Sequence, residues 1–243
     1  MTIEIWPVEG LPEIREGDDI GAMLVEPLRA RSARNGDVVA ITQKIVSKAE
    51  GRVVPDEGAG RSAWVERETR RVVARRGDLV IAETRHGFVC ANAGVDASNV
   101  EAGFVSLLPV DPDESAERIR VLLGERLGLE SLGVVITDTF GRPWRNGLVN
   151  VAIGCAGLPA LVDLRGESDH HGRELEVTVV ALADEVAAAS GLVMGKAARV
   201  PAALVRGVVR GEAANGRARD LVRPADEDLF RVGVIESSDA RGA

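Results

Sequence analysis

The apolar runs of this chain are short, and this feature most limits what the chain can fold into. Runs at residues 37–41, 79–82, 104–108 and 133–137 each border a glycine or an aspartate, a pattern that predicts buried strands. No uncharged apolar run approaches the ~20 residues that a membrane-spanning helix needs. We therefore expect several strands in a protein core and no association with a membrane.

Helical periodicity marks four further segments. In one of them Asp113 is expected to cap the N-terminus and Gly128 to end the helix. In another, Pro27 lies inside the periodic stretch and predicts a kink or two short helices. The four helices are expected at residues 19–33, 61–76, 113–127 and 183–196.

The order of the elements favours an α+β fold. Strands and helices do not alternate strictly, as they would in a parallel α/β protein. Residues 174–182 begin by alternating apolar with polar side chains, which is typical of antiparallel pairing, and residues 202–209 predict another strand. We expect residues 1–243 to form one domain of mixed sheets with flanking helices, whole or divided into two sub-domains.

Composition excludes several functions. The chain has 30 Lys and Arg against 38 Asp and Glu, a net charge of −8, which argues against a broad electrostatic grip on nucleic acid. With three Trp, four Phe and no Tyr, stacking platforms for single strands are not expected. Cys90 and Cys155 form no CxxC pair, and the N-terminus has no signal-peptide pattern. These features predict buried free thiols and a cytoplasmic protein.

Familiar nucleotide and metal motifs are absent from the sequence. Residues 191–197 only faintly resemble a P-loop, because one spacer residue and the magnesium-binding hydroxyl are missing. His170 and His171 are adjacent, so we expect them to point apart, to be solvated and to form no two-histidine metal face.

The most informative segment follows the run at residues 133–137. Asp138 lies between two threonines, and a glycine-containing loop then supplies Arg142 and Arg145. Carboxylate and hydroxyl oxygens suit Mg²⁺ or Mn²⁺, and guanidinium groups suit phosphate or carboxylate oxygens. This combination is typical of phosphoryl transfer. The alternative is an ordinary turn, with Asp138 as a helix N-cap and two solvated arginines.

Two other segments add polar residues near the ends of apolar runs. Asp96 and Asn99 can bind a metal and a ligand, or they can form an Asx turn. Lys48 and Arg52 follow the run at residues 37–41 and can neutralise phosphate, or they can belong to an exposed basic turn.

Together, these segments resemble the coenzyme F420-0:L-glutamate ligase (gamma-glutamyl ligase) family. The resemblance extends from about residue 4 to residue 230 and includes a weaker N-terminal loop, Gly10-Leu11-Pro12-Glu13. The segments that carry it most specifically are residues 44–52, 94–99 and 137–147.

The resemblance implies an α+β fold that forms an intertwined homodimer, with no flavin-binding C-terminal domain in this chain. It implies a ligase that uses GTP and Mg²⁺ or Mn²⁺, with K⁺ as a further candidate, to add L-glutamate to a deazaflavin precursor and then to add γ-linked glutamates. By motif, it assigns the metal to Asp96, Asp138 and Thr139. It assigns nucleotide contacts to Leu11, Pro12, Glu13, Ile14, Gln43, Lys48 and Asn99.

An acyl phosphate is the expected intermediate, because a carboxylate has no good leaving group for attack by an amine. In this scheme Lys48, Arg142 and Arg145 hold anionic oxygens, and His86 or Glu50 is the candidate base. Two alternatives use the same residues: a metal-dependent phosphatase or kinase, and a nucleotide-binding module without catalysis.

Overall fold

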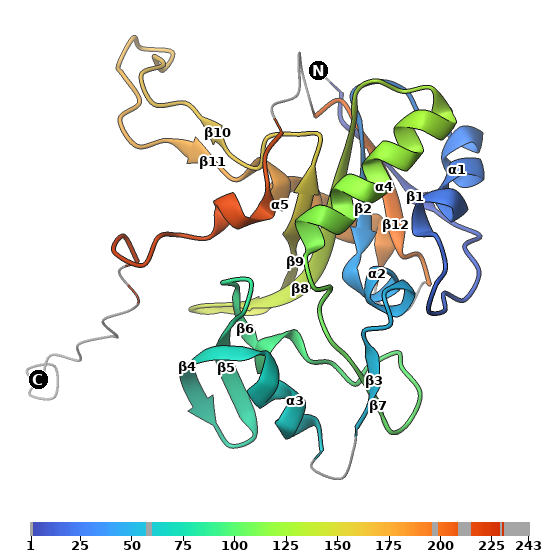
Figure 1. Ribbon diagram of the computed structural model, residues 1–243. Coiled ribbons are helices and arrows are strands. Elements are labelled where there is room, and N and C mark those ends of the chain that lie inside the picture. Colours follow the sequence, from blue (N-terminus) through green and yellow to red (C-terminus); the bar gives the residue numbers. More distant parts are fainter. Residues whose placement is uncertain (1, 57–59, 196–198, 209–214, 229, 231–243) are drawn as a thin grey trace, which may run out of the picture.

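A computed structural model describes residues 2–56, 60–195, 199–208, 215–228 and 230 of the chain. Its described part contains one mixed five-stranded sheet, one antiparallel three-stranded sheet and two short two-stranded ribbons, with helices packed around them (Figure 1). The α+β prediction is therefore confirmed.

The five-stranded sheet contains the longest strands. Its neighbouring strands are antiparallel except for the central pair β2 and β8, which run parallel with Thr42 opposite Thr137. Their apolar side chains are fully buried, as the short apolar runs predicted. In spatial order the strands are β1 (Glu4–Val8), β12 (Ala202–Arg206), β2 (Asp37–Thr42), β8 (Leu132–Arg142) and β9 (Arg145–Ala156).

Helices cover both faces of this sheet. Helix α4 (Pro112–Leu127) lies on one face with α1 (Ile20–Ala30) beside it, and α5 (Leu182–Met194) lies on the other face (Figure 1). Helix α1 is continuous, so the prediction of two short helices around Pro27 is wrong. Buried side chains on α1, such as Leu24 and Leu28, outweigh the one hydrogen bond that a proline removes.

The predicted helix at residues 61–76 is half wrong. Helix α3 (Arg61–Glu68) ends after two turns, and β4 (Thr69–Arg76) follows it directly. A turn at Gly77, whose φ of +58° suits glycine, pairs β4 with β5 (Leu79–Thr84), which also pairs with β6 (Val89–Ala91). The β-branched residues of β4 fit a strand better than a helix, and this pairing decides between the two.

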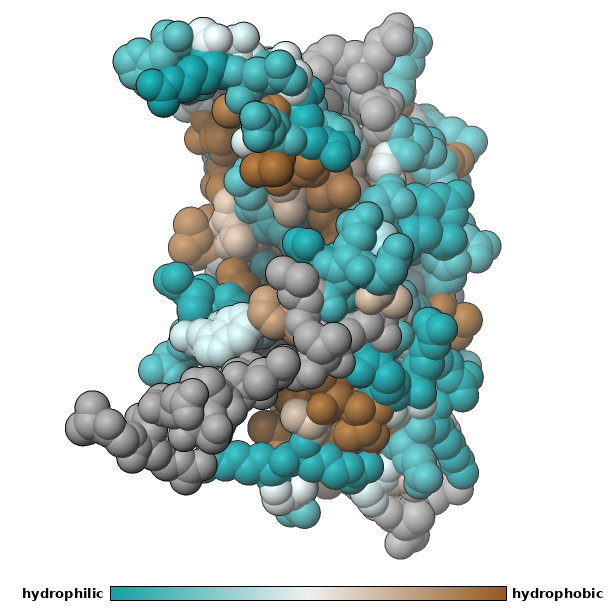
Figure 2. All heavy atoms as spheres, turned by 90° about the vertical axis from the view of Figure 1, so that its left-hand side faces the viewer, coloured by the Kyte–Doolittle hydropathy of each residue, from teal (hydrophilic) through white to brown (hydrophobic). Residues whose placement is uncertain are grey.

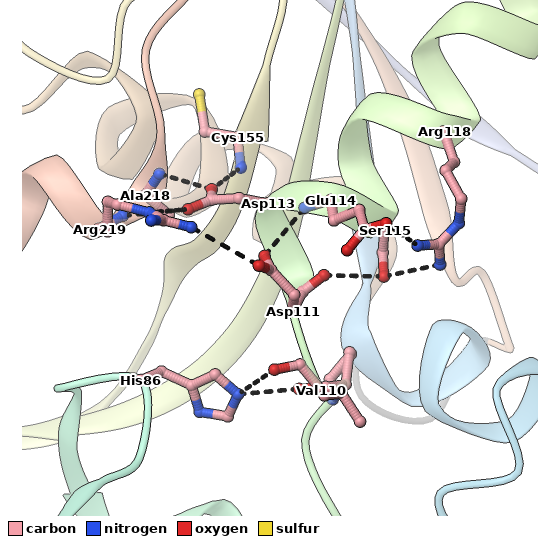
Figure 3. Close-up of polar contacts among 11 residues, drawn as sticks. His86, Val110, Asp111, Asp113, Glu114, Ser115, Arg118, Cys155, Ala218 and Arg219 are labelled. Carbon is pink, nitrogen blue, oxygen red and sulfur yellow. Dashed lines mark hydrogen bonds and ion pairs between the residues drawn. The ribbon is translucent and has the colours of Figure 1, made fainter.

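The N-terminus of α4 also differs from the prediction. Its N-cap is Asp111, whose Oδ1 accepts a hydrogen bond from the amide of Glu114 at 3.0 Å, because Pro112 fits the first helical position. Asp113 turns inward instead and is 7% exposed. Its Oδ1 accepts hydrogen bonds from the amides of Cys155 and Ala218, as Figure 3 shows. Gly128 ends the helix in the left-handed conformation, as predicted.

Most of the predicted strand at residues 174–182 does not form. Within it the one strand described is β11 (Val179–Val180), which pairs with β10 (Val162–Asp163), while Glu174 forms an isolated bridge with Ser168 and Val177 is 85% exposed. The alternating pattern is present, but no described element covers its apolar side. The remaining ribbon joins β3 (Val53–Pro55) to β7 (Phe104–Ser106). The ends of two predicted elements, at residues 196 and 209, lie outside the described residues.

Three other predictions can be checked in the described residues. Cys90 and Cys155 are buried and free, as predicted. His170 and His171 are exposed as predicted, but their rings lie 3.7 Å apart, so the expectation that they point apart is wrong. Among the described residues, no helix is long and apolar enough to cross a membrane.

Candidate functional site

The parallel pair β2–β8 places two of the predicted segments at one edge of the main sheet. Thr42 and Thr137 lie opposite each other, and the residue that follows each of them along the chain begins a polar segment. On one side this segment is the short helix α2 (Gln43–Ala49), and on the other it is Asp138. Ligands commonly bind at the carboxyl ends of parallel strands, where such segments meet.

Asp138 lies next to the three-stranded sheet through Cys90. Burial raises the pKa of the Cys90 thiol to about 12, and the negative charge of Asp138 adds to this effect. The backbone amide of Gly94 donates a hydrogen bond to the same thiol. One buried thiol therefore interacts with both the Asp138 segment and the loop that leads to Asp96.

Asp96 is held in a tight turn by Lys44 and Ser98. The Lys44 ammonium lies 2.6 Å from Oδ2 of Asp96, and the Ser98 amide donates to Oδ1 at 2.8 Å. Burial, the largest single influence, raises the pKa of Asp96, but the hydrogen bonds from Lys44 and Ser98 outweigh it and lower the pKa overall. Asn99, the predicted nucleotide contact, is exposed in the same turn with a φ of +57°.

The predicted N-terminal loop lies against α2. Glu13 and Lys48 form an ion pair at 2.5 Å between Oε1 and Nζ, which lowers the pKa of Glu13. Ile14 is buried and Leu11 packs against the core, so the loop is anchored on both sides of the exposed residues Pro12 and Glu13. The structure therefore brings this loop and Lys48 together.

Gln43, like Ile14, is a predicted nucleotide contact that is buried. It is only 1% exposed, and its Oε1 accepts a hydrogen bond from the Ser47 hydroxyl at 2.7 Å. In this structure its side chain has no surface open to a ligand.

The two predicted arginines lie at the tip of the β8–β9 hairpin. Arg142 is opposite Arg145, and one of its terminal nitrogens donates to the carbonyl of Asn146 at 2.7 Å. Arg142 is four residues beyond Asp138, a span of about 13 Å in extended strand. The structure therefore places both arginines away from Asp138 along the strand, and Arg145 is exposed.

Thr139 points away from Asp138. Consecutive side chains of a strand lie on opposite faces of the sheet. The Thr139 hydroxyl donates to Oδ1 of Asn150 at 2.9 Å, and the amide of Asn150 lies 3.1 Å from where a Cβ at Gly191 of α5 would be. Thr139 is thus on the face covered by α5, whereas Asp138 faces Cys90.

The two candidate bases are engaged in structural contacts. Glu50 accepts hydrogen bonds through Oε1 from Ser115 and Arg118. His86 has Nε2 2.9 Å and 3.1 Å from two backbone carbonyl oxygens, those of Pro109 and Val110, beside the start of α4 (Figure 3). Since carbonyl oxygens only accept hydrogen bonds, this nitrogen carries the proton.

The donor set fits a hard divalent cation in part. Asp96 and Asp138 supply carboxylate oxygens, which Mg²⁺ and Mn²⁺ prefer. Among the described residues, no group of three His, Cys, Asp or Glu side chains could hold a metal ion. A cation between these two aspartates would therefore need further ligands from a bound substrate or water, and nucleotide phosphates commonly supply them.

Sequence reasoning missed two residues of this site, Lys44 and Cys90. Lys44 lies in the segment that predicted Lys48, one helical turn earlier, and that spacing on α2 was the available signal. Cys90 gave no signal, because a lone cysteine in an apolar run predicts only burial.

Comparison with known proteins identifies the family of this chain. The family model described as F420-0:Gamma-glutamyl ligase matches residues 10–207. The "Coenzyme F420:L-glutamate ligase" of Methanothermobacter thermautotrophicus is 44% identical over 252 residues, which cover 95% of this chain and 100% of that protein. The proteins of the same name in Methanopyrus kandleri and Methanocaldococcus jannaschii are 42% and 40% identical, over 95% and 94% of this chain and 98% and 97% of their own lengths. The chain therefore belongs to the F420-0:gamma-glutamyl ligase family.

Proposed function

We propose that this protein is a ligase that forms an amide between L-glutamate and the carboxylate of the deazaflavin precursor F420-0, and then adds γ-linked glutamates. GTP is the proposed phosphoryl donor, and Mg²⁺ or Mn²⁺ is the proposed metal. One observation carries the proposal: the segments that hold Lys48 and Asp138 begin where the parallel pairing of β2 with β8 ends at Thr42 and Thr137, and Lys44 of the same helix α2 holds the Asp96 turn. Family membership supports the choice of reaction.

The proposed chemistry activates a carboxylate in two steps. An oxygen of the precursor carboxylate attacks the γ-phosphorus of GTP, the bond from that phosphorus to the bridging oxygen breaks, and GDP leaves. The amine of glutamate then attacks the acyl carbon, loses a proton and releases phosphate. Lys48, whose ammonium pairs with the largely exposed Glu13, is the proposed contact to phosphate oxygens during the first step.

The divalent cation has a limited role in this proposal. Asp96 and Asp138 are the residues that would hold it, with Thr139 facing the other side of the sheet. When bound, such a cation supplies positive charge to phosphate oxygens. The substrates are anionic and the chain carries a net charge of −8, so local positive charge is needed at this site.

One assay tests the proposal against its alternatives. The protein is incubated with GTP, Mg²⁺ or Mn²⁺, L-glutamate and the deazaflavin precursor, and the mass of the deazaflavin is measured by mass spectrometry. A mass gain of one or more glutamate residues that depends on GTP supports the ligase. GTP hydrolysis without a mass gain would favour a phosphatase, a gain of phosphate alone would favour a kinase, and nucleotide binding without turnover would favour a binding module.

Replacing Lys48 tests the nucleotide contact. Lys48→Ala should weaken GTP binding by about tenfold or more and lower turnover, because a charge-assisted contact to phosphate is lost. The thermal midpoint without ligand should change little, since the partner of Lys48, Glu13, is largely exposed. Isothermal titration with GTP measures the first effect, and Arg85→Ala, which removes a cation outside the site, is the control. An unchanged GTP affinity would mean that Lys48 forms a surface ion pair and does not contact the nucleotide.

A homodimer is part of the proposal, and the exposed surface supports it. Figure 2 shows hydrophobic side chains grouped in an upper and a lower area of the face that lies to the left in Figure 1. The β10–β11 arm, the β8–β9 hairpin tip and the three-stranded sheet lie on that side. Each of them exposes large apolar residues, which often mark a protein interface. These are Val177 and Val179 in the arm, Trp144 and Leu148 in the hairpin, and Leu79 and Val89 in the sheet.

Light scattering tests the dimer directly. We expect a particle of about twice the 25.7 kDa chain mass at low micromolar concentration. Its unfolding midpoint should rise with protein concentration, because dissociation and unfolding are coupled in an obligate dimer. A fully active monomer would exclude the dimer and leave the proposed ligase reaction untouched.

A further inference from the structure

The environment of Lys44 is the one expected for a cation-binding position. Its ammonium lies 2.6 Å from Oδ2 of Asp96 and 2.9 Å from the carbonyl oxygen of Ser98, and it also contacts the Ser98 hydroxyl. Three oxygens of these types are also what a hard cation such as Mg²⁺ or Mn²⁺ accepts as ligands. The Lys44 side chain is only 21% exposed, so most of it is enclosed by protein.

The ammonium and a metal cannot use Asp96 in the same way at once. The Oδ1 atom of Asp96 already accepts the Ser98 amide at 2.8 Å, and Oδ2 accepts the Ser98 hydroxyl at 2.7 Å in addition to Lys44. A divalent cation on Oδ2 would lie a few ångströms from a second positive charge, and like charges at that separation repel. Binding of the metal to Asp96 therefore requires Lys44 to move.

We propose that Lys44 is a placeholder for the divalent cation: it holds the Asp96 turn folded until the metal arrives, then leaves Asp96 and faces the nucleotide. This inference rests on the proposed function, because it assumes a metal at Asp96. It assigns to Lys44 a positioning role that Lys48, the predicted phosphate contact, does not have.

The position of Lys44 on α2 determines where its ammonium goes. Residues four positions apart lie on one side of a helix, so Lys44 and Lys48 share a face of α2. The two lysines hold opposite sides of the site, Lys44 at the Asp96 turn and Lys48 at the Glu13 loop. Because Lys44 and Lys48 share a face of α2, a Lys44 ammonium released from Asp96 remains on the helix face that carries Lys48, the proposed phosphate contact.

Removing the ammonium tests the competition. Lys44→Met keeps most of the apolar stem and removes the charge. In the absence of nucleotide it should bind Mn²⁺ about fivefold more tightly than the wild type, since a competing ion pair is gone. The free Mn²⁺ signal in electron paramagnetic resonance measures this affinity directly, without any activity assay.

Lys48→Met is the matched control. Lys48 is on the same helix, has the same 21% side-chain exposure and is also paired with a carboxylate, but that carboxylate belongs to Glu13, which is not a proposed metal ligand. Its Mn²⁺ affinity without nucleotide should stay within about twofold of the wild type, because only a distant charge is lost. Equal gains in Lys44→Met and Lys48→Met would mean a general charge effect and would overturn the placeholder role.

Two further variants separate failure of this inference from failure of the proposed metal site. Lys44→Arg should bind Mn²⁺ more weakly than the wild type, because a guanidinium pairs with a carboxylate bidentately and is harder to displace. Asp96→Asn should weaken Mn²⁺ binding if the metal is held there. An unchanged affinity in Asp96→Asn would reject the metal position itself. If Asp96→Asn binds Mn²⁺ more weakly than the wild type but Lys44→Met does not bind it more tightly, only the placeholder role is rejected. Weaker Mn²⁺ binding by Lys44→Met would mean that Lys44 only keeps the turn folded.

Discussion

Asp138→Asn should lower glutamate ligation by about a hundredfold or more while leaving the fold intact. Asparagine has nearly the same shape as aspartate but lacks the negative charge that would hold a cation next to the phosphates. Asp138 lies where β8 leaves the buried part of the sheet, so the isosteric asparagine should fit there without disturbing the core. Turnover with saturating GTP and glutamate is the measurement, and the unfolding midpoint should stay close to that of the wild type.

The same variant should also respond to metal. If Asp138 binds the cation, raising the Mn²⁺ concentration should recover part of the lost rate, because a weaker site is filled by mass action. Asp163→Asn, which removes a carboxylate from an exposed ion pair with Arg165, is the control and should keep wild-type turnover at every metal concentration. Near wild-type turnover in Asp138→Asn would remove this residue from the mechanism.

The central part of the site was predictable because it depends on local pattern. Short apolar runs followed by polar residues predicted β2 and the buried part of β8. Lys48 lies in the helix that follows the first run, and Asp138 follows the second run directly, still within β8. Two such runs form neighbouring strands, so their polar ends meet at one edge without further information. The α+β class followed from the same runs and from the helical periodicity between them.

Other features were not predictable because they depend on partners far away in the chain. The contact between Lys44 and Ser98 joins residues 54 positions apart, which no local pattern reports. The sequence of the second half of residues 61–76 is compatible with a helix or a strand, and its pairing with β5 makes it a strand. Asp113 was expected to cap α4, but Asp111 precedes a proline, which leaves Asp113 to accept buried amides.

The alternation of side chains along a strand separates two adjacent residues that the resemblance assigned to metal ions. The resemblance assigned Asp138 and Thr139 to bound metal ions, yet consecutive strand residues face opposite sides, and Thr139 contacts Asn150 near α5. The side chains of Asp138 and Thr139 therefore lie on opposite faces of the sheet. We propose Asp96 and Asp138 as the carboxylate ligands of the divalent cation, so the metal-binding and turnover experiments replace these two residues.

Removing one partner of the ion pair between Asp37 and Arg206 should strongly destabilise the main sheet. Asp37 is 1% exposed and accepts two hydrogen bonds from the guanidinium, at 2.8 Å and 2.7 Å, which tie β2 to β12. Asp37→Ala leaves a largely buried positive charge without its carboxylate, a change that costs about 3–5 kcal/mol. The thermal midpoint should fall by about 6 °C or more at a fixed protein concentration.

Two companion variants test the cause of that loss. Asp163→Ala breaks a similar pair with Arg165 that is exposed on both sides, so its midpoint should stay within error of the wild type. Asp37→Leu combined with Arg206→Met replaces both partners by apolar groups and should recover most of the stability, because no charge is then left buried alone. Urea unfolding, which gives the midpoint and its slope separately, measures all three variants. A midpoint for Asp37→Ala equal to that of Asp163→Ala would show that this pair is solvated and that hydrophobic burial alone holds β2 against β12.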